Sequence, residues 1–151
     1  GEFTVPIGLC EKLIDGNDIT VVSYGSTVNI VMEAADILKD SGIKIEVIDV
    51  QTLIPFDRKK LISASLNKTN RLMIVDEDVP GGGSGYILSE LIKNQEIYSL
   101  LDCSPVLLTA KEHRPAYGTD GDYFSKPSKE DIYEEAYKIM HESNPKKYPE
   151  I

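Results

Sequence analysis

The stretch DITVVSYGSTVNIVMEAADILKDSG, residues Asp18–Gly42, predicts the fold class. Its first part, Asp18–Tyr24, is a β-branched and aromatic run between polar residues and a glycine, which is typical of a buried strand. Apolar residues then recur at helical spacing until the final glycine, so we expect a helix capped by Ser26 or Thr27. A strand, a tight turn and a helix therefore follow one another directly.

The same order repeats downstream. Ile43–Val50 alternates and then becomes continuously apolar, which predicts a second strand, and Asp57 is the candidate cap of the helix after it. Arg71–Asp76 predicts a third strand, followed by the loop Glu77–Gly85 and another helix. Strands that alternate with helices predict a parallel sheet with helices on both faces.

Shorter signals complete the expected architecture. Val106–Thr109 predicts a further core strand, and Phe3–Leu13 predicts a short edge strand. Ser128 and Asp131 form a capping box for a final helix that runs through Met140. The expected fold is thus a three-layer αβα domain with a mostly parallel sheet of about five strands, and residues 1–151 form a single domain.

Charge and hydropathy exclude several classes of partner. The chain has 151 residues with 16 Lys and Arg against 25 Asp and Glu, a formal net charge of −9. Such a chain repels nucleic acid and anionic lipid, so the expected partners include neither nucleic acid nor membrane. No segment approaches the roughly 18 consecutive apolar residues of a membrane span. Cys10 and Cys103 match no redox or zinc pattern, which favours buried free thiols and a cytoplasmic location.

The glycine-rich stretch Gly81–Gly85 has two interpretations. Its backbone amides could cradle an anion at a helix N-terminus, which would make the chain an anion- or nucleotide-binding module. The stretch fits no phosphate-loop motif, however, and the carboxylates of Asp76, Glu77 and Asp78 precede it. The alternative is that the glycines permit positive φ and close packing. The three carboxylates could themselves ligate a hard cation, or could lie in a solvated turn with Glu77 as an interface acceptor.

The segment Lys111–Pro127 has no periodicity, which predicts a functional loop or an interface arm. It contains His113, Arg114 and Tyr117. An imidazole titrates near neutral pH, so His113 is conceivable as a general base, but no recognised nucleophile arrangement accompanies it. A surface or interface histidine is the alternative. We expect no catalytic, cofactor-binding or metal-binding residue in this chain.

Four quoted pieces carry a resemblance to a known family. They are TVPIG (Thr4–Gly8), DITVVSYGSTV (Asp18–Val28), VIDVQTLIPFD (Val47–Asp57) and VDEDVPGGGSG (Val75–Gly85). Together they resemble the C-terminal domain of transketolase-type thiamine-diphosphate enzymes. The closest resemblance is to the beta subunit, or fused beta half, of pyruvate and 2-oxoisovalerate (branched-chain) dehydrogenases.

The resemblance implies an oxidoreductase activity that this chain does not perform alone. Enzymes of that family decarboxylate a 2-oxoacid and transfer the acyl group to a lipoyl arm within a multienzyme complex. The resemblance implies that thiamine diphosphate and Mg²⁺ are bound by domains absent from this chain, which would be a fragment of a longer enzyme. The isolated domain is therefore expected to be inactive.

The implied role of the domain is assembly. The family resemblance implies three partners: the remaining domains or alpha subunit, a second beta subunit, and the basic subunit-binding domain of a lipoyl acyltransferase. The net charge of −9 suits a basic partner. The candidate interface residues are Glu77, Gly82, Gly83, Gly85, His113, Arg114 and Tyr117. A pure interaction domain without any enzyme context is a third possibility.

Overall fold

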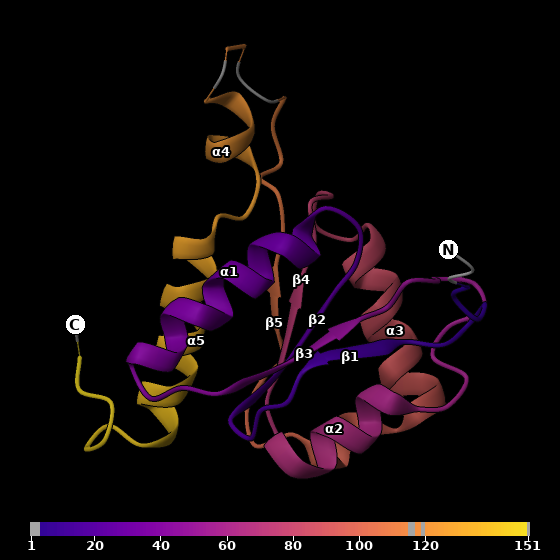
Figure 1. Cartoon of the computed structure of the whole chain (residues 1–151), viewed down its shortest axis with the longest axis horizontal. Coiled ribbons are helices and arrows are strands. Elements are labelled where there is room, and N and C mark those ends of the chain that lie inside the picture. Colours follow the sequence, from indigo (N-terminus) through magenta and orange to yellow (C-terminus); the bar gives the residue numbers. More distant parts are fainter. Residues whose placement is uncertain (1–3, 115–116, 119, 151) are drawn as a thin grey trace.

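The computed structural model describes residues 4–114, 117–118 and 120–150, and shows a five-stranded sheet between two helical layers (Figure 1). The sheet order is β1-β3-β2-β4-β5, with all neighbours parallel except β1, which is antiparallel to β3. The strands are β1 (Glu11–Ile14), β2 (Ile19–Ser23), β3 (Ile45–Asp49), β4 (Leu72–Val75) and β5 (Val106–Leu108). The predicted three-layer αβα fold is therefore confirmed.

The central strand β2 is buried on both faces, as its apolar run predicts. Val21 packs into the hydrophobic cluster on one face, and Val22 packs into the cluster on the other. Helices α1 (Thr27–Asp40) and α5 (Lys129–Ser143) cover the first face. Helices α2 (Leu61–Thr69) and α3 (Gly83–Gln95), with the 3₁₀ helix η1 (Ile97–Leu100), cover the second.

Two predicted caps are confirmed in their function. The carboxylate of Asp57 accepts the amides of Leu61 and Ile62 at 2.9 and 3.0 Å, although Lys60 directly precedes α2. Ser128 and Asp131 form the reciprocal capping box at the start of α5. Each cap satisfies backbone donors that the first helical turn leaves without an internal partner.

Several predicted boundaries were wrong. Val106–Thr109 is not a core strand, because β5 lies at the sheet edge and its residues are only half-buried. Helix α3 begins at Gly83, inside the predicted loop, and α5 continues past Met140 to Ser143. The expected edge strand exists as β1, but it begins only at Glu11.

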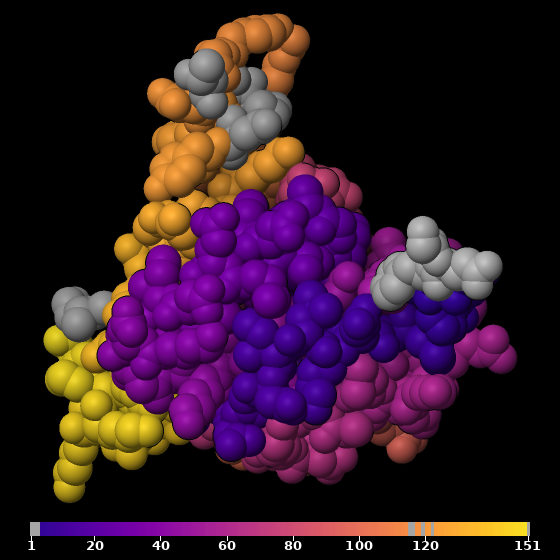
Figure 2. Space-filling model, in the orientation of Figure 1, coloured from indigo at the N-terminus to yellow at the C-terminus, as the bar shows by residue number. Residues whose placement is uncertain are grey.

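We call the segment Lys111–Pro127 the arm; its described residues project from the body and include the short helix α4 (Gly121–Ser125) (Figures 1 and 2). Beyond α5 the tail folds back, and Tyr148 is 3% exposed in the α1–α5 cluster. Its hydroxyl donates to the Gly42 carbonyl at 3.3 Å. No helix within the described ranges is long and apolar enough to cross a bilayer.

Candidate functional site: a closed crevice beneath a projecting arm

The topology places one crevice at the carboxyl ends of β2 and β4. From the central strand β2 the chain passes through α1 to β3 on one side, and later through α2 to β4 on the other. The strand order therefore reverses between β2 and β4. Open α/β sheets bind ligands outside the carboxyl ends of the strands at such a reversal point. Any small-molecule site of this domain is expected there.

Side chains of the domain itself fill this crevice. Tyr24 follows β2 and Asp76 follows β4, and the tyrosine hydroxyl donates to Asp76 Oδ1 at 2.8 Å. The amide of Ser84 in the first turn of α3 donates to Asp76 Oδ2 at 2.7 Å, and the Asp78 amide donates to Oδ1 at 3.0 Å. Asp76 is completely buried. Its carboxylate therefore occupies the position at the α3 N-terminus that would favour a bound anion.

The pKa of Tyr24 is raised above its ordinary value. Burial is the largest cause, and the hydrogen bond to Asp76 adds to it. The phenol therefore stays protonated and remains a donor to the carboxylate at neutral pH.

This arrangement corrects two interpretations of the sequence. Asp76 does not lie in a solvated turn, because it is buried and holds the start of a helix. The predicted anion-binding turn is shorter than Gly81–Gly85, because Gly83 and Gly85 already belong to α3. The Ser84 amide, which an anion would need, is taken by Asp76.

The close-packing interpretation agrees with two of the three candidate interface glycines. A Cβ atom at Gly82 would collide with the carboxylate of Asp78, and one at Gly83 would collide with the hydroxyl of Tyr24. At Gly85 a Cβ would meet no atom within 4 Å. Contacts within the domain therefore leave little space for a side chain at Gly82 and Gly83, whereas Gly85 has no such restriction.

Glu77 connects the crevice to the base of the arm. Its Oε2 accepts a hydrogen bond from the Ser26 hydroxyl at 2.8 Å and one from the Lys126 ammonium at 3.2 Å. These two partners, Ser26 first, lower the pKa of the Glu77 carboxyl. Ser26 lies at the N-cap position of α1, yet its side chain makes no cap hydrogen bond. The predicted capping serine instead links α1 to Glu77.

The arm brings three predicted interface residues together. The ring of His113 lies 5.8 Å from that of Phe124, Lys111 Nζ lies 3.9 Å from the same ring, and Arg114 lies over the ring of Tyr117. The Lys111 amide donates to the Ser125 carbonyl at 2.9 Å and closes the base. Three aromatic side chains of the arm are exposed, with exposed fractions of 86, 65 and 60% for Tyr117, Tyr123 and Phe124. This is the composition of a contact surface.

A groove of about 740 Å³ lies between the arm and α1. Its lining includes Ser26, Glu33, Glu77, Tyr123, Lys126 and Glu130. Ser26, Glu33 and Glu130 were not predicted as site residues, because they come from separate segments of the chain. The one usable signal was the rule that the carboxyl ends of parallel strands meet at one edge.

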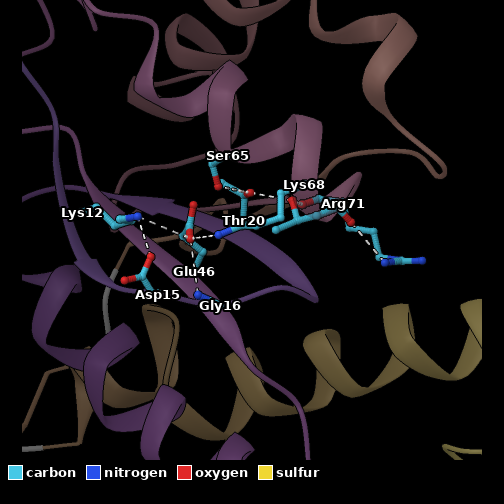
Figure 3. Close-up of polar contacts among 9 residues, drawn as sticks. Lys12, Asp15, Gly16, Thr20, Glu46, Ser65, Lys68 and Arg71 are labelled. Carbon is cyan, nitrogen blue, oxygen red and sulfur yellow. Dashed lines mark hydrogen bonds and ion pairs between the residues drawn. The ribbon is translucent and has the colours of Figure 1, made fainter.

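A second polar cluster lies at the other, amino-terminal edge of the sheet, beneath α2 (Figure 3). Glu46 of β3 is 2% exposed and accepts hydrogen bonds from the Gly16 amide at 3.3 Å and from the Lys68 ammonium. Burial raises the pKa of Glu46, but these hydrogen bonds outweigh burial and the net pKa is lowered. Thr20 is hydrogen-bonded to Ser65 at 2.6 Å. The cluster therefore joins α2 to the sheet, away from the crevice.

The residues at the crevice do not fit a diphosphate or its metal. The carboxylates of Asp76 and Asp78 lie at the start of α3 and would repel phosphate oxygens. Within the described part of the chain, no group of three or more His, Cys, Asp and Glu residues is placed to hold a metal ion. No step of thiamine-dependent chemistry is therefore assigned to these residues.

Comparisons with known proteins identify relatives along most of the chain. A pyruvate dehydrogenase E1 component subunit beta from Rickettsia felis is 29% identical over 92% of this chain and 42% of its own length. A mitochondrial pyruvate dehydrogenase E1 subunit beta from Pisum sativum is 33% identical over 95% of this chain and 39% of its own. The beta subunit of the Bacillus subtilis acetoin:2,6-dichlorophenolindophenol oxidoreductase is 35% identical over 75% and 32%. The chain thus spans about two fifths of the first relatives.

A solved structure has the same fold. A split-gene transketolase, described as an inactive beta4 tetramer, superposes with a TM-score of 0.74 at 24% identity, covering 92% of this chain and 43% of that chain. The family model for the transketolase C-terminal domain matches residues 8–132. The chain therefore belongs to the transketolase C-terminal domain family, as its four sequence pieces indicate.

Proposed function

We propose that this chain is the C-terminal assembly domain of a thiamine-diphosphate-dependent 2-oxoacid dehydrogenase. The pyruvate dehydrogenase E1 beta subunits among its relatives support the choice of enzyme. The observation that supports assembly rather than catalysis is the crevice between β2 and β4, which Tyr24 and Asp76 fill. Tyr24 and Asp76 occupy the position at which open α/β sheets bind small molecules, which favours a role in assembly over one in ligand binding.

The proposed partners are the alpha subunit or remaining domains, a second beta subunit, and the basic subunit-binding domain of a lipoyl acyltransferase. The charge of −9 supports a basic partner, because complementary charge speeds encounter and excludes wrong partners. The exposed arm supports subunit contacts through His113, Arg114 and Tyr117. Glu77, beside the base of the arm, is proposed for the same contacts, as are Gly82, Gly83 and Gly85 at the start of α3.

In this proposal the chemistry lies in other parts of a longer, cytoplasmic enzyme, of which residues 1–151 are one domain. Thiamine diphosphate with Mg²⁺ would supply the carbanion stabilisation needed to cleave the bond to the 2-oxoacid carboxylate. This domain would hold the catalytic subunits together in the assembled enzyme.

The test compares turnover of pyruvate and branched-chain 2-oxoacids, with thiamine diphosphate and Mg²⁺, by the 151-residue chain and by its longer gene product. Activity only in the longer protein supports the assembly role. Activity of the 151 residues alone contradicts the proposal, as does the absence of 2-oxoacid turnover by the longer protein mixed with its alpha subunit.

A thermal shift with pyrophosphate separates this function from an anion-binding module. A ligand that binds only the folded state stabilises it by mass action. Because Asp76 occupies the α3 N-terminus, we expect no concentration-dependent rise in the melting temperature of this chain. A saturable rise would show that the anion-binding interpretation is correct.

A further inference from the structure

The two most exposed aliphatic side chains of the described residues belong to two segments that contact each other. Ile54 is 80% exposed and Ile7 is 72% exposed, and Val5 beside them is 43% exposed. Each belongs to the N-terminal segment or to the loop between β3 and α2. Exposed apolar side chains on neighbouring segments are a candidate protein interaction site.

The two segments that carry these apolar side chains are fixed to each other by hydrogen bonds. The Gly8 amide donates to Thr52 Oγ1 at 3.3 Å, and the Arg58 amide donates to the Gly8 carbonyl at 2.9 Å. Gly8 has φ +82, and a Cβ atom there would lie 2.8 Å from Pro55 Cγ. The N-terminal segment is thus held against the β3–α2 loop by hydrogen bonds and by close packing. Ile7 and Ile54 therefore lie on two segments that are hydrogen-bonded to each other, and not on a free chain end.

Three consecutive exposed cations border the apolar surface. Arg58, Lys59 and Lys60 follow Ile54 after three intervening residues of the same loop, and no ion pair joins any of them to a carboxylate among the residues described. Their neighbour Asp57 is buried and caps α2. We call Val5, Ile7, Ile54 and residues 58–60 the Ile54 patch. An unpaired basic border on a chain of net charge −9 fits a partner surface whose apolar centre is rimmed by carboxylates.

A small groove of about 270 Å³ adjoins the patch. It is lined by Thr4, Val5, Pro6, Leu9, Cys10, Glu11 and Gln51. A groove of this size accepts one apolar side chain, and buried apolar anchors in such pockets dominate the energy of protein interfaces.

The position of the patch identifies its occupant. Val5 and Ile7 of the N-terminal segment belong to the patch and Thr4 lines the adjoining groove, so the polypeptide that precedes Thr4 continues from the edge of this surface. The chain spans 42% of the Rickettsia relative, and its family is a C-terminal domain. We propose that the Ile54 patch is the docking surface for the polypeptide that precedes this domain in the longer enzyme, through apolar side chains bordered by carboxylates. The existence of that polypeptide rests on the proposed function.

Two other occupants fit the observations less well. Two copies of the patch brought together by a twofold axis would oppose the same three cations. An anionic membrane would be repelled by the remainder of a chain whose net charge is −9.

Hydrogen exchange of the longer gene product and of the 151-residue chain tests the proposal. The amides of Ile7 and Ile54 donate to no acceptor within the described residues, so they exchange quickly in this chain. We expect exchange at residues 5–9 and 52–56 to slow by about tenfold or more in the longer protein. Residues 96–101, which include the exposed Tyr98, provide the reference and should not change.

The paired variant Ile54→Ser with Lys59→Glu should restore fast exchange in the longer protein, whereas Tyr98→Ser should not. Both altered side chains are exposed, so the melting temperature of the 151-residue chain should move by no more than about 2 °C. Equal exchange in the long and short proteins overturns the proposal, as does a gene that encodes nothing before Gly1. Patch-dependent self-association of the 151-residue chain, or its binding to phosphatidylserine vesicles, also overturns it. Because 2-oxoacid turnover is a separate readout, a longer protein that is inactive even with its alpha subunit, but whose patch is protected, contradicts the proposed reaction and not the docking.

Discussion

Gly16 shows how one residue without a side chain fixes a turn of the sheet. A Cβ atom at this position would lie well inside contact distance of the Ile45 carbonyl group. Gly16→Ala must therefore push β3 away or open the turn, and we expect a loss of roughly 3 kcal/mol in the free energy of unfolding. Gly85→Ala is the matched control, because it lies in α3 with no atom near its Cβ position. That variant should gain about 0.5–1 kcal/mol.

Urea unfolding of both variants measures these changes. A Gly16→Ala protein as stable as the unaltered chain would mean that the turn relaxes freely. A destabilised Gly85→Ala protein would mean that the first turn of α3 needs glycine for a reason other than space.

Glu46 gives the domain a pH-dependent stability at the level of one side chain. Its folded-state pKa lies below the ordinary value of 4.5, so the carboxylate stabilises the folded state above that pH. This contribution is lost as the pH falls through the lowered folded-state pKa. Glu46→Gln should cost about 2 kcal/mol at pH 7, and the difference from the unaltered chain should shrink at acid pH. Denaturant unfolding from pH 7 to pH 3 measures it, with the exposed Glu134→Gln as control.

At the scale of elements, α5 depends on its capping box. Ser128 Oγ accepts the Asp131 amide at 3.1 Å, and the Asp131 carboxylate accepts the Ser128 amide at 2.8 Å. Ser128→Ala should lower the free energy of unfolding by about 1 kcal/mol. Ser89→Ala, in an exposed position of α3, should change it by less than about half of that. If thermal unfolding shows the same loss of stability for both substitutions, the capping box does not stabilise α5 specifically.

The elements that sequence predicts correctly are those with local signals. Asp57 and Ser128 hold amides within a few residues of themselves, so spacing alone reveals their role. The role of Asp76 depends on Tyr24, which is 52 residues away, and no local pattern reports such a partner. The early start of α3 has a related cause, because the Ser84 amide in its glycine-rich first turn donates to the buried Asp76 carboxylate, which Tyr24 also contacts.

At the scale of the whole molecule, the arm and the body are expected to respond separately to substitution. Phe124 is 60% exposed, and its ring contacts described above are with Lys111 and His113 of the same arm. Phe124→Ala should therefore change the free energy of unfolding of this chain by less than about 1 kcal/mol. If the arm makes subunit contacts, the same substitution should shift the longer enzyme to smaller species in sedimentation velocity. Tyr98→Ala on η1 is the control, and an unchanged assembly with Phe124→Ala would contradict a contact role for the arm.

The sequence predicts less of the candidate interaction surfaces than of the fold. Three arm residues, His113, Arg114 and Tyr117, were predicted together because they adjoin in the chain. The Ile54 patch was not predicted, and only the folded loop shows Ile54 on the surface. Surface exposure of an apolar residue depends on the path of the backbone, which periodicity does not report.

The folded-back tail has a practical consequence for shortened forms of this domain. Tyr148 lies in the α1–α5 cluster, and the hydroxyl of Tyr137 donates to the Pro149 carbonyl at 2.9 Å. A truncation at the visible end of α5 would therefore uncover an aromatic surface and leave the Gly42 carbonyl without this donor. Such a protein would be prone to aggregate for reasons unrelated to its partners. Expression boundaries set by the last helix would remove part of the core, whereas boundaries set after Pro149 would retain it.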